Sequence, residues 1–348
     1  MAGSPSGEIA PGQAAVQGRG RLGECELPRR AGCPTLEGME YRRYASFLPA
    51  RHRPDPPIDP TSTWWSWRGR RIHVARASAP DAAIRLMVIH GGGGYSGALW
   101  PIAAAVAREG VEVLAPDMPL YGDTVEPDPG SVRYQDWLDL LSDLVAAERA
   151  HDRRPLVLLG ASMGGLMAYE TAARTGEIAH VVATCLLDTS DRAARRAAAR
   201  IPAIGPVAPS LMKAVDLLCG RVRVPIRWLV DMNNMSLDPE LTRLCATDPK
   251  GGGVRVPLGF LCSWLNFEHA QPETFRAAPV TLVHPAADRW TPPEVSIRFL
   301  DRIAGLTNLV LLENCGHYPI EEPGLSQLVD ALRTVRDEVL SGSPDTAP

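Results

Sequence analysis

Short apolar runs alternate with longer amphipathic stretches along most of this chain. Residues 63–78 (TWWSWRGRRIHVARAS) flank a turn at Arg68-Gly69, which predicts two antiparallel strands. Continuous apolar runs predict further strands at 85–92, 111–120, 155–162, 180–188, 279–288 and 308–316. Apolar residues at helical spacing predict helices at 100–110, 131–152, 164–176, 292–305 and 325–340. This alternation is typical of a mostly parallel sheet with helices on both faces.

One long stretch interrupts the alternation. Residues 189–278 contain helical pieces broken by proline and glycine, with no strong strand among them. The strand and helix pattern then resumes at residue 279. The sequence therefore predicts an α/β core formed by residues 36–188 and 279–342, with a helical cap inserted at 189–278.

The two ends of the chain lack any such period. Residues 1–35 are rich in Gly, Pro, Ala and Ser, so we expect them to be disordered, like the tail at 343–348. Residues 36–62 include RHRPDPPIDPTS, whose prolines favour an extended, irregular chain over a helix. The first residues do not contain the apolar core of a secretory signal. No run of about 18 apolar residues predicts a transmembrane helix.

Composition narrows the possible partners. The chain has 348 residues, 45% of them hydrophobic and 22% charged, which is typical of a soluble globular protein. A formal net charge of −4 gives no basic field that would concentrate nucleic acid. The basic stretch DRAARRAAAR (191–200) is interpreted as a solvated helix face, with an anionic substrate head group as the alternative. The 7 cysteines form no CxxC pair, so we expect reduced thiols, no zinc site and a cytoplasmic location.

A serine stands at the junction between a predicted strand and a predicted helix. The sequence Gly160-Ala161-Ser162-Met163-Gly164 fits G-x-S-x-G, in which a sharp turn exposes the serine above the sheet. The flanking glycines suit a turn where a side chain would strike the neighbouring helix and strand. The helix N-terminus also favours negative charge developing at this point. We therefore predict that Ser162 is a nucleophile.

Serine needs a base within hydrogen-bonding reach to act as a nucleophile at neutral pH. His317 follows the strand at 308–316 and precedes the last helix, which places it at the same sheet edge as Ser162. Asp288 ends the strand at 279–288 and is predicted to orient the imidazole. Asp188, at the end of the preceding strand, is the alternative acid. Asp288 alone could instead cap the helix that follows it.

A glycine run follows the strand at 85–92. In His90-Gly91-Gly92-Gly93-Gly94 the backbone N–H groups are unobstructed, as an oxyanion hole requires. We predict that the N–H groups of Gly92 and Met163 are its donors, with Gly93 as the alternative to Gly92. His90 is expected to stabilise this loop by hydrogen bonding. The run lacks the spacing of a phosphate-binding loop.

These motifs, in this order, resemble the α/β-hydrolase superfamily over residues 63–342. The resemblance rests on HGGGG, GASMGG, the aspartate of AADRWTP and the histidine of CGHYP, and is closest to the monoacylglycerol lipase, lysophospholipase and esterase branch. It implies the α/β-hydrolase fold, with a mostly parallel eight-stranded sheet, a catalytic triad and an inserted helical cap. The loop that usually reads D-x-x-G-x-G is DMPLYGDT here, beginning at Asp117. Because the glycine pattern is only partly kept, the sequence does not predict the shape of this loop. A serine nucleophile argues against haloalkane dehalogenase or epoxide hydrolase chemistry.

The predicted function is hydrolysis of a small-molecule carboxylic ester through an acyl-enzyme on Ser162, without metal or organic cofactor. A medium-chain acyl or aromatic ester is favoured over a highly charged substrate. Most apolar side chains of the inserted cap are expected to form its core, and some to line an acyl pocket: Met212, Leu217, Trp228, Met232, Met235, Phe260, Trp264 and Phe267. The sequence does not distinguish a monomer from a homo-oligomer.

Four alternatives share this pattern. A serine aminopeptidase or amidase would need carboxylates for a substrate ammonium, for which Glu268 and Glu273 are the candidates. A thioesterase or a C–C bond hydrolase would use the same three residues. A non-catalytic receptor on this fold would bind a ligand without turnover.

Overall fold

The computed structural model describes residues 36–198, 208–228 and 230–342. The predictions made for residues 1–35 and 343–348 lie outside these ranges. Among the described residues, no helix is both long and apolar enough to cross a membrane. The cysteines within these ranges are free thiols.

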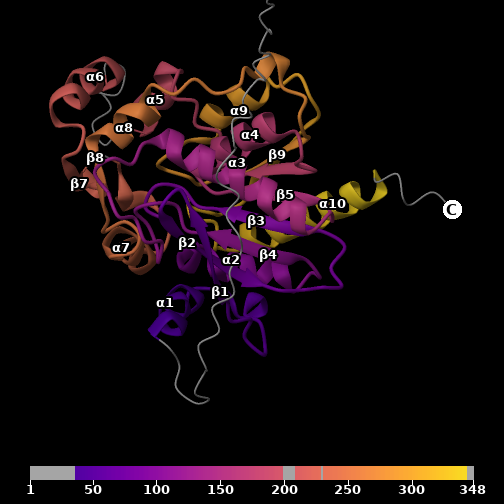
Figure 1. The fold of residues 1–348 in the computed structure, drawn as a ribbon. Coiled ribbons are helices and arrows are strands. Elements are labelled where there is room, and N and C mark those ends of the chain that lie inside the picture. Colours follow the sequence, from indigo (N-terminus) through magenta and orange to yellow (C-terminus); the bar gives the residue numbers. More distant parts are fainter. Residues whose placement is uncertain (1–35, 199–207, 229, 343–348) are drawn as a thin grey trace, which may run out of the picture.

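An eight-stranded sheet forms the centre of the molecule (Figure 1), with the order β1-β2-β4-β3-β5-β6-β9-β10. Its strands are β1 (Thr61–Trp67), β2 (Arg70–Ala77), β3 (Arg85–Ile89), β4 (Glu112–Pro116), β5 (Leu156–Gly160), β6 (His180–Ala183), β9 (Val280–Pro285) and β10 (Thr307–Leu312). The pairs β1–β2 and β2–β4 are antiparallel, and every other neighbouring pair is parallel. The mostly parallel eight-stranded sheet expected from the sequence is confirmed.

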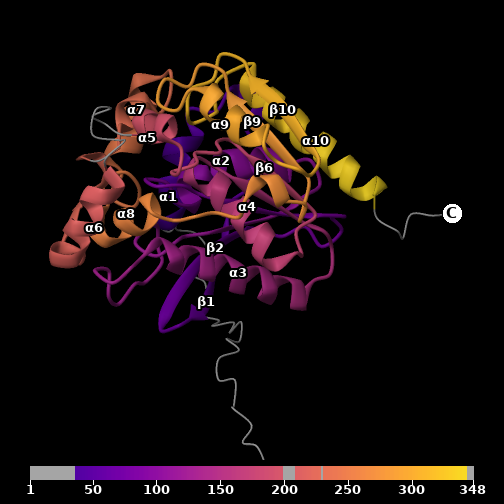
Figure 2. The same ribbon diagram turned by 90° about the horizontal axis from the view of Figure 1, so that it is seen from above.

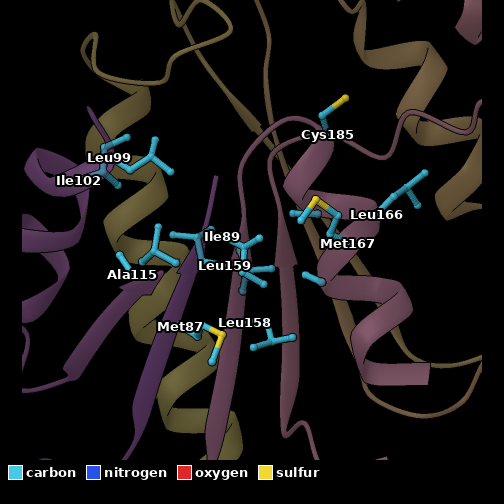
Figure 3. Packing of buried hydrophobic residues seen from close by; sticks show 14 of the residues in the cluster. Met87, Ile89, Leu99, Ile102, Ala115, Leu158, Leu159, Leu166, Met167 and Cys185 are labelled. Atoms are coloured by element: carbon cyan, nitrogen blue, oxygen red, sulfur yellow. The ribbon is translucent and has the colours of Figure 1, made fainter. Parts of the chain in front are cut away.

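Helices pack on both faces of this sheet. They are α2 (Ser96–Ala107), α3 (Tyr134–His151), α4 (Met163–Thr175), α9 (Pro293–Leu300) and α10 (Gly324–Ser341). Figure 3 shows Leu159 of β5 between Ile102 of α2 on one side and Met167 of α4 on the other. All three side chains are buried. Continuous apolar strands are needed here because helices cover both faces of the sheet.

The observed bounds of most predicted elements differ by one to five residues, and helix α2 and strand β6 are two examples. Helix α2 begins at Ser96, four residues before the predicted start at 100. Strand β6 ends at Ala183, although the apolar run continues to 188. Beyond that point the chain leaves the sheet, since the N–H of Leu186 donates to the side chain of Ser296 (2.9 Å) and not to a strand. The residues remain buried, so their apolar character alone did not mark the end of the strand.

An N-terminal helix was not predicted. Residues 36–62 were expected to be irregular, but α1 (Leu36–Ala45) is helical, and a 3-10 turn follows at Ala50–His52. Helix α1 packs against α2, and Tyr44 and Leu48 are buried. The prolines that argued against a helix all follow α1, so the prediction was wrong for the residues before them.

The inserted residues gather at one end of the sheet, as both ribbon views show (Figures 1 and 2). They form α5 (Arg192–Ala198), α6 (Ala208–Cys219), α7 (Pro239–Thr247) and α8 (Leu258–Leu265), with 3-10 turns at Ile226–Trp228, Met232–Asn234 and Pro272–Thr274. The segment also contains a two-stranded sheet, β7 (Arg223–Pro225) with β8 (Arg255–Pro257). Strands of three residues are too short to give an alternating pattern, which is why the sequence did not indicate them.

Candidate active site

Ser162 lies at a sharp turn between β5 and α4. Its backbone has φ 55° and ψ −124°, a conformation that costs a non-glycine residue free energy and occurs at functional turns. The helix packs so tightly that a Cβ on Gly165 would lie 1.9 Å from the carbonyl oxygen of Cys185. A Cβ on Gly164 would lie 2.3 Å from the carbonyl oxygen of Ile89. Both contacts are with backbone, so only glycine fits at these two positions.

A threonine that sequence reasoning missed supports this turn. The N–H of Ser162 donates to Oγ1 of Thr184 (3.0 Å), which directly follows β6. The N–H of Gly165 donates to the carbonyl oxygen of Ser162 (2.9 Å). These two bonds hold Ser162 in its unusual conformation from both sides. A hydroxyl residue at the end of the neighbouring strand was the available sequence signal.

Three side chains from distant parts of the chain form a hydrogen-bonded series. Nε2 of His317 lies 2.8 Å from Oγ of Ser162, and Nδ1 of His317 lies 2.7 Å from Oδ2 of Asp288. His317 and Asp288 are both buried. The structure therefore brings together the three residues that the sequence placed at one sheet edge. The rival, Asp188, lies elsewhere and faces Arg302 at 3.6 Å.

From the described part of the chain, Asp288 accepts four hydrogen bonds. Oδ1 accepts from the backbone N–H groups of Trp290 (2.8 Å) and Thr291 (2.9 Å). Oδ2 accepts from the hydroxyl of Thr291 (2.7 Å) and from His317. Burial alone would raise the pKa of Asp288, but the charge of His317 and these hydrogen bonds lower it to about 2. Asp288 is therefore ionised at neutral pH and can stabilise an imidazolium.

The proposed capping role of Asp288 takes a different form. Helix α9 begins at Pro293, and its N-cap position is Pro292, so Asp288 does not cap the helix itself. Its carboxylate instead closes the turn that precedes the helix through the N–H groups of Trp290 and Thr291. Thr291 was not predicted as a site residue; the available turn signal was Asp288 itself, because an aspartate side chain can bond the backbone two residues on.

The loop that carries His317 is tied to the inserted segment. The carboxylate of Glu321 accepts from the N–H of Gly316 (3.1 Å), next to His317. The same carboxylate accepts from the hydroxyl of Ser236 (2.6 Å) and from the N–H of Leu237 (2.7 Å). Glu321 therefore bridges the histidine loop and the insertion. Nothing in the sequence distinguished it from its neighbour in the run IEEP.

The glycine loop lies against the serine turn. A Cβ on Gly91 would lie 2.9 Å from the backbone nitrogen of Met163. Met163 is the first residue of α4, so its N–H has no acceptor within the helix. Among the described residues, no hydrogen bond is made by the N–H of Gly92. Both groups expected to form an oxyanion hole are thus available to a ligand.

His90 holds the glycine loop from below. Its Nε2 accepts from the N–H of Met118 (2.9 Å), so the proton is on Nδ1, which donates to the carbonyl oxygen of Gly91 (2.8 Å). Burial lowers the pKa of His90, which keeps the ring neutral. The imidazole ring of His90 makes edge-on contacts with the rings of Tyr121 and Trp137. This agrees with the structural role expected of His90.

The DMPLYGDT loop closes around Asp117. Its carboxylate accepts from the N–H groups of Ser96 (2.7 Å) and Asp123 (2.9 Å) and lies 2.8 Å from Nδ1 of His73. A Cβ on Gly122, which has φ 59°, would lie 2.0 Å from the same carboxylate. Gly122, the glycine retained from the usual D-x-x-G-x-G pattern, is therefore required because the carboxylate of Asp117 leaves no room for a Cβ at this position.

Three of these side chains could also hold a metal ion by geometry. Ligand atoms of His73, Asp117 and Asp123 lie within 4.8 Å of one another. However, Asp123 is paired with Lys250 at 2.6 Å, and Asp117 already accepts several hydrogen bonds. These contacts give His73, Asp117 and Asp123 a structural role in the loop without a metal ion.

A mostly apolar pocket, partly open to solvent, adjoins Ser162 and His317. Its wall comes mainly from the glycine loop, from Ala98, Leu99 and Ile102 of α2, and from Tyr44, Tyr318 and Leu328. Of the residues that the structure describes, no Asp, Glu, Lys or Arg contributes to the lining.

The insertion contributes little to this pocket. Of its eight apolar residues considered from the sequence, only Met235 is part of the lining. Phe260 and Trp264 are buried, Phe260 in part against Trp137 of α3, whereas Leu217 and Trp228 are 86% and 59% exposed. The expectation of burial is met for Phe260 and Trp264 and not for Leu217 and Trp228. Tyr44 belongs to the helix that the sequence analysis missed.

The sequence of this chain is similar to those of known hydrolases. A family model described as the alpha/beta hydrolase family matches residues 86–329. A probable cadicidin biosynthesis thioesterase from Streptomyces griseus is 33% identical over 159 residues, which are 42% of this chain and 39% of that protein. Human protein phosphatase methylesterase 1 is 27% identical over 172 residues, 47% of this chain and 44% of that protein. The matched regions thus span less than half of either relative.

Solved structures show the same fold. A soluble variant of monoglyceride lipase from Saccharomyces cerevisiae superposes with a TM-score of 0.66 at 15% identity, covering 80% of this chain and 96% of that one. A monoacylglycerol lipase from Paleococcus ferrophilus gives a TM-score of 0.60 at 20% identity, covering 78% and 99%. At such identities the likeness establishes the architecture alone.

Proposed function

The chain belongs to the alpha/beta hydrolase family, and on that premise we propose that it hydrolyses carboxylic esters through an acyl-enzyme on Ser162. One observation carries the proposal: Oγ of Ser162 lies 2.8 Å from Nε2 of His317, whose Nδ1 lies 2.7 Å from Asp288. A hydroxyl, an imidazole and a buried carboxylate in this order can activate the serine.

The proposed reaction has two halves. Oγ of Ser162 attacks the ester carbonyl carbon while Nε2 of His317 takes its proton, and the oxyanion accepts hydrogen bonds from the N–H groups of Gly92 and Met163. The tetrahedral intermediate collapses, and His317 returns the proton to the leaving alcohol. Water then attacks the acyl-enzyme, with His317 as general base, and releases the acid and free Ser162.

The pocket supports an uncharged, apolar acyl group. Among the described residues, no Asp, Glu, Lys or Arg side chain lines it, and its two imidazoles belong to His90 and His317. Neither candidate carboxylate for an aminopeptidase is part of this lining, since Glu268 is exposed and Glu273 pairs with Arg302 at 2.8 Å on the surface. Ester hydrolysis therefore accounts for the site better than removal of an amino-terminal residue.

Thioester hydrolysis is the second candidate. Its support is the 33% identity to a probable thioesterase from Streptomyces griseus, over less than half of that protein. The same three side chains would act, with a thiol in place of the leaving alcohol. Oxoesters and thioesters of the same acyl chain, compared by kcat/KM, distinguish the two candidates.

Hydrolysis of a p-nitrophenyl ester tests the proposal. The wild type should turn over the ester and be labelled by a fluorophosphonate, whereas Ser162→Ala should do neither. Ser190→Ala, which removes an exposed hydroxyl outside the site, is the matched control and should retain both. Unchanged turnover in Ser162→Ala would remove Ser162 from the mechanism. Ligand binding by a wild type with neither turnover nor labelling would favour a non-catalytic receptor.

Two further expectations from the sequence concern the insertion and the location of the protein. We propose that residues 189–278 act as a cap over the site, and that the protein works in the cytoplasm on a small-molecule substrate. Crosslinking the insertion to the core, followed by measurement of KM for esters of increasing size, tests the first. Cell fractionation tests the second.

A further inference from the structure

A turn of the insertion closes on its own aspartate. This glycine turn (residues 248–253) follows α7 and reads DPKGGG. The N–H groups of Gly251 (3.0 Å) and Gly253 (2.7 Å) both donate to the carbonyl oxygen of Asp248. The N–H of Lys250 donates to Oδ1 of the same residue (2.9 Å). The glycine turn is therefore a defined structure organised by Asp248.

The glycine turn lies directly on the glycine loop after β3 (residues 91–94), which we call the oxyanion loop. A Cβ on Gly251 would lie 2.7 Å from the carbonyl oxygen of Gly93, and a Cβ on Gly93 would lie 3.6 Å from Cα of Gly252. Gly251 and Gly252 are buried. Backbone thus packs on backbone with no room for a side chain on Gly251.

A second contact fixes the turn to the core on its other side. The carbonyl oxygen of Lys250 accepts from the N–H of Gly122 (3.0 Å), and Nζ of Lys250 lies 2.6 Å from Asp123. Gly122 and Asp123 belong to the loop that folds around Asp117. The glycine turn therefore contacts the oxyanion loop and its neighbouring loop together.

The side chain of Asp248 extends this attachment. Oδ2 accepts from the hydroxyl groups of Tyr44 (2.8 Å) and Tyr95 (3.1 Å), and all three side chains are buried. Tyr95 directly follows Gly94 and stands at the N-cap position of α2. Burial, together with the charges of Cys245 and Asp248, raises the pKa of Tyr44, so its hydroxyl remains a donor. Asp248 thus joins α1, the start of α2 and the insertion.

The oxyanion loop needs such an attachment for a physical reason. Consecutive glycines have the largest conformational freedom of any residues, yet an oxyanion hole works only when its donors are fixed before the reaction. His90 and Asp117 hold the loop from the core side, through Gly91 and Ser96. On the opposite side, the atoms nearest to a Cβ built on Gly93 belong to Met232 and to Gly252 of the glycine turn.

We propose that Asp248 is a positioning residue, which holds Tyr95 and the glycine turn so that the N–H of Gly92 is aimed at the developing oxyanion. The insertion would then complete the catalytic geometry as well as cover the site. This inference rests on the proposed function, since it needs an oxyanion to form next to Ser162.

The experiment compares an ester with its thionoester, in which sulfur replaces the carbonyl oxygen. Sulfur accepts hydrogen bonds poorly, so the ratio of kcat for the two substrates reports how well the oxyanion hole works. Tyr95→Phe, which removes one hydroxyl, should lower kcat for the oxoester about ten-fold with little change in KM. The oxoester to thionoester ratio should fall by a similar factor. Asp248→Asn should lower both quantities further.

Tyr169→Phe is the matched control, because its hydroxyl is also lost from a partly buried bond, to the carbonyl oxygen of Ala270 (3.0 Å). It should leave the ratio at the wild-type value. Gly251→Ala adds a methyl group against Gly93 and removes no side-chain hydrogen bond, so it should reproduce the effect of Tyr95→Phe even if Asp248→Asn fails to fold. A ratio that stays at the wild-type value in both Tyr95→Phe and Gly251→Ala would overturn the proposal. Fluorophosphonate labelling of Ser162 in the wild type is scored separately, so failure of the proposed function would be recognised by itself.

Discussion

Replacing Asp288 by asparagine should invert the proton positions of the proposed triad. Oδ1 of Asp288 accepts from two backbone N–H groups, those of Trp290 and Thr291, which cannot turn away. The amide oxygen of an asparagine would therefore take the Oδ1 position, because only an oxygen can accept both bonds. Its NH₂ group would then face Nδ1 of His317 in place of Oδ2.

The consequence falls on the other imidazole nitrogen. Nδ1 would become the acceptor and Nε2 would carry the proton, pointing it at Oγ of Ser162, 2.8 Å away. A protonated Nε2 cannot accept the proton of the serine, so the base is lost although the geometry survives. Substitutions of this kind lower kcat by about 10⁴, which corresponds to roughly 5 kcal/mol of transition-state stabilisation.

The assay is steady-state hydrolysis of a p-nitrophenyl ester at neutral pH, with the rate of fluorophosphonate labelling as a second readout. Asp188→Asn is the matched control, because Asp188 ends the neighbouring apolar run but faces Arg302 and not His317. It should retain nearly the wild-type rate. An Asp288→Asn rate within about ten-fold of wild type, or equal losses in the two variants, would refute this account of the triad.

Three further outcomes are expected. Because the folded-state pKa of Asp288 is lowered from 3.8 to about 2, its ionised form adds stability above pH 3.8 that is lost as the pH falls toward 2. The difference in unfolding free energy between wild type and Asp288→Asn should therefore shrink by about 2 kcal/mol over that interval, as denaturant titrations would show. Gly165→Ala should lower the unfolding free energy by at least ~2 kcal/mol, since its Cβ would meet the backbone of Cys185, and an unchanged thermal midpoint would contradict the packing described. Ile102→Ala should shift the preferred ester toward longer acyl chains, whereas Phe267→Ala, outside the pocket lining, should leave the chain-length profile as it is.

Much of the core could be predicted from the sequence because its signals are local. Strand β5 and helix α4 meet within the few residues around Ser162, so the period of the pattern changes at the serine itself. The sequence also gives the order Ser162, Asp288, His317 directly, together with the predicted strand end that each residue follows. Parallel strands bring their carboxyl ends to a common edge, which converts order along the chain into proximity.

Other features of the site had no local signal. Helix α1 lacks an apolar period strong enough to oppose the proline-rich residues after it, yet Tyr44 lines the pocket and bonds to Asp248. Thr184 and Glu321 are ordinary polar residues in the sequence. They acquire their roles only from what lies opposite them, namely the N–H of Ser162 and the N–H of Gly316.

The sequence by itself determined the sheet, its flanking helices, and the glycine, serine, aspartate and histidine positions at its edge, because each depends on a short-range pattern of apolar residues and turns. Only the tertiary structure decided which walls form the pocket and which turn of the insertion rests on Gly93. Those contacts join segments more than 100 residues apart, and complementary shape and paired hydrogen bonds between such segments leave no period along the chain.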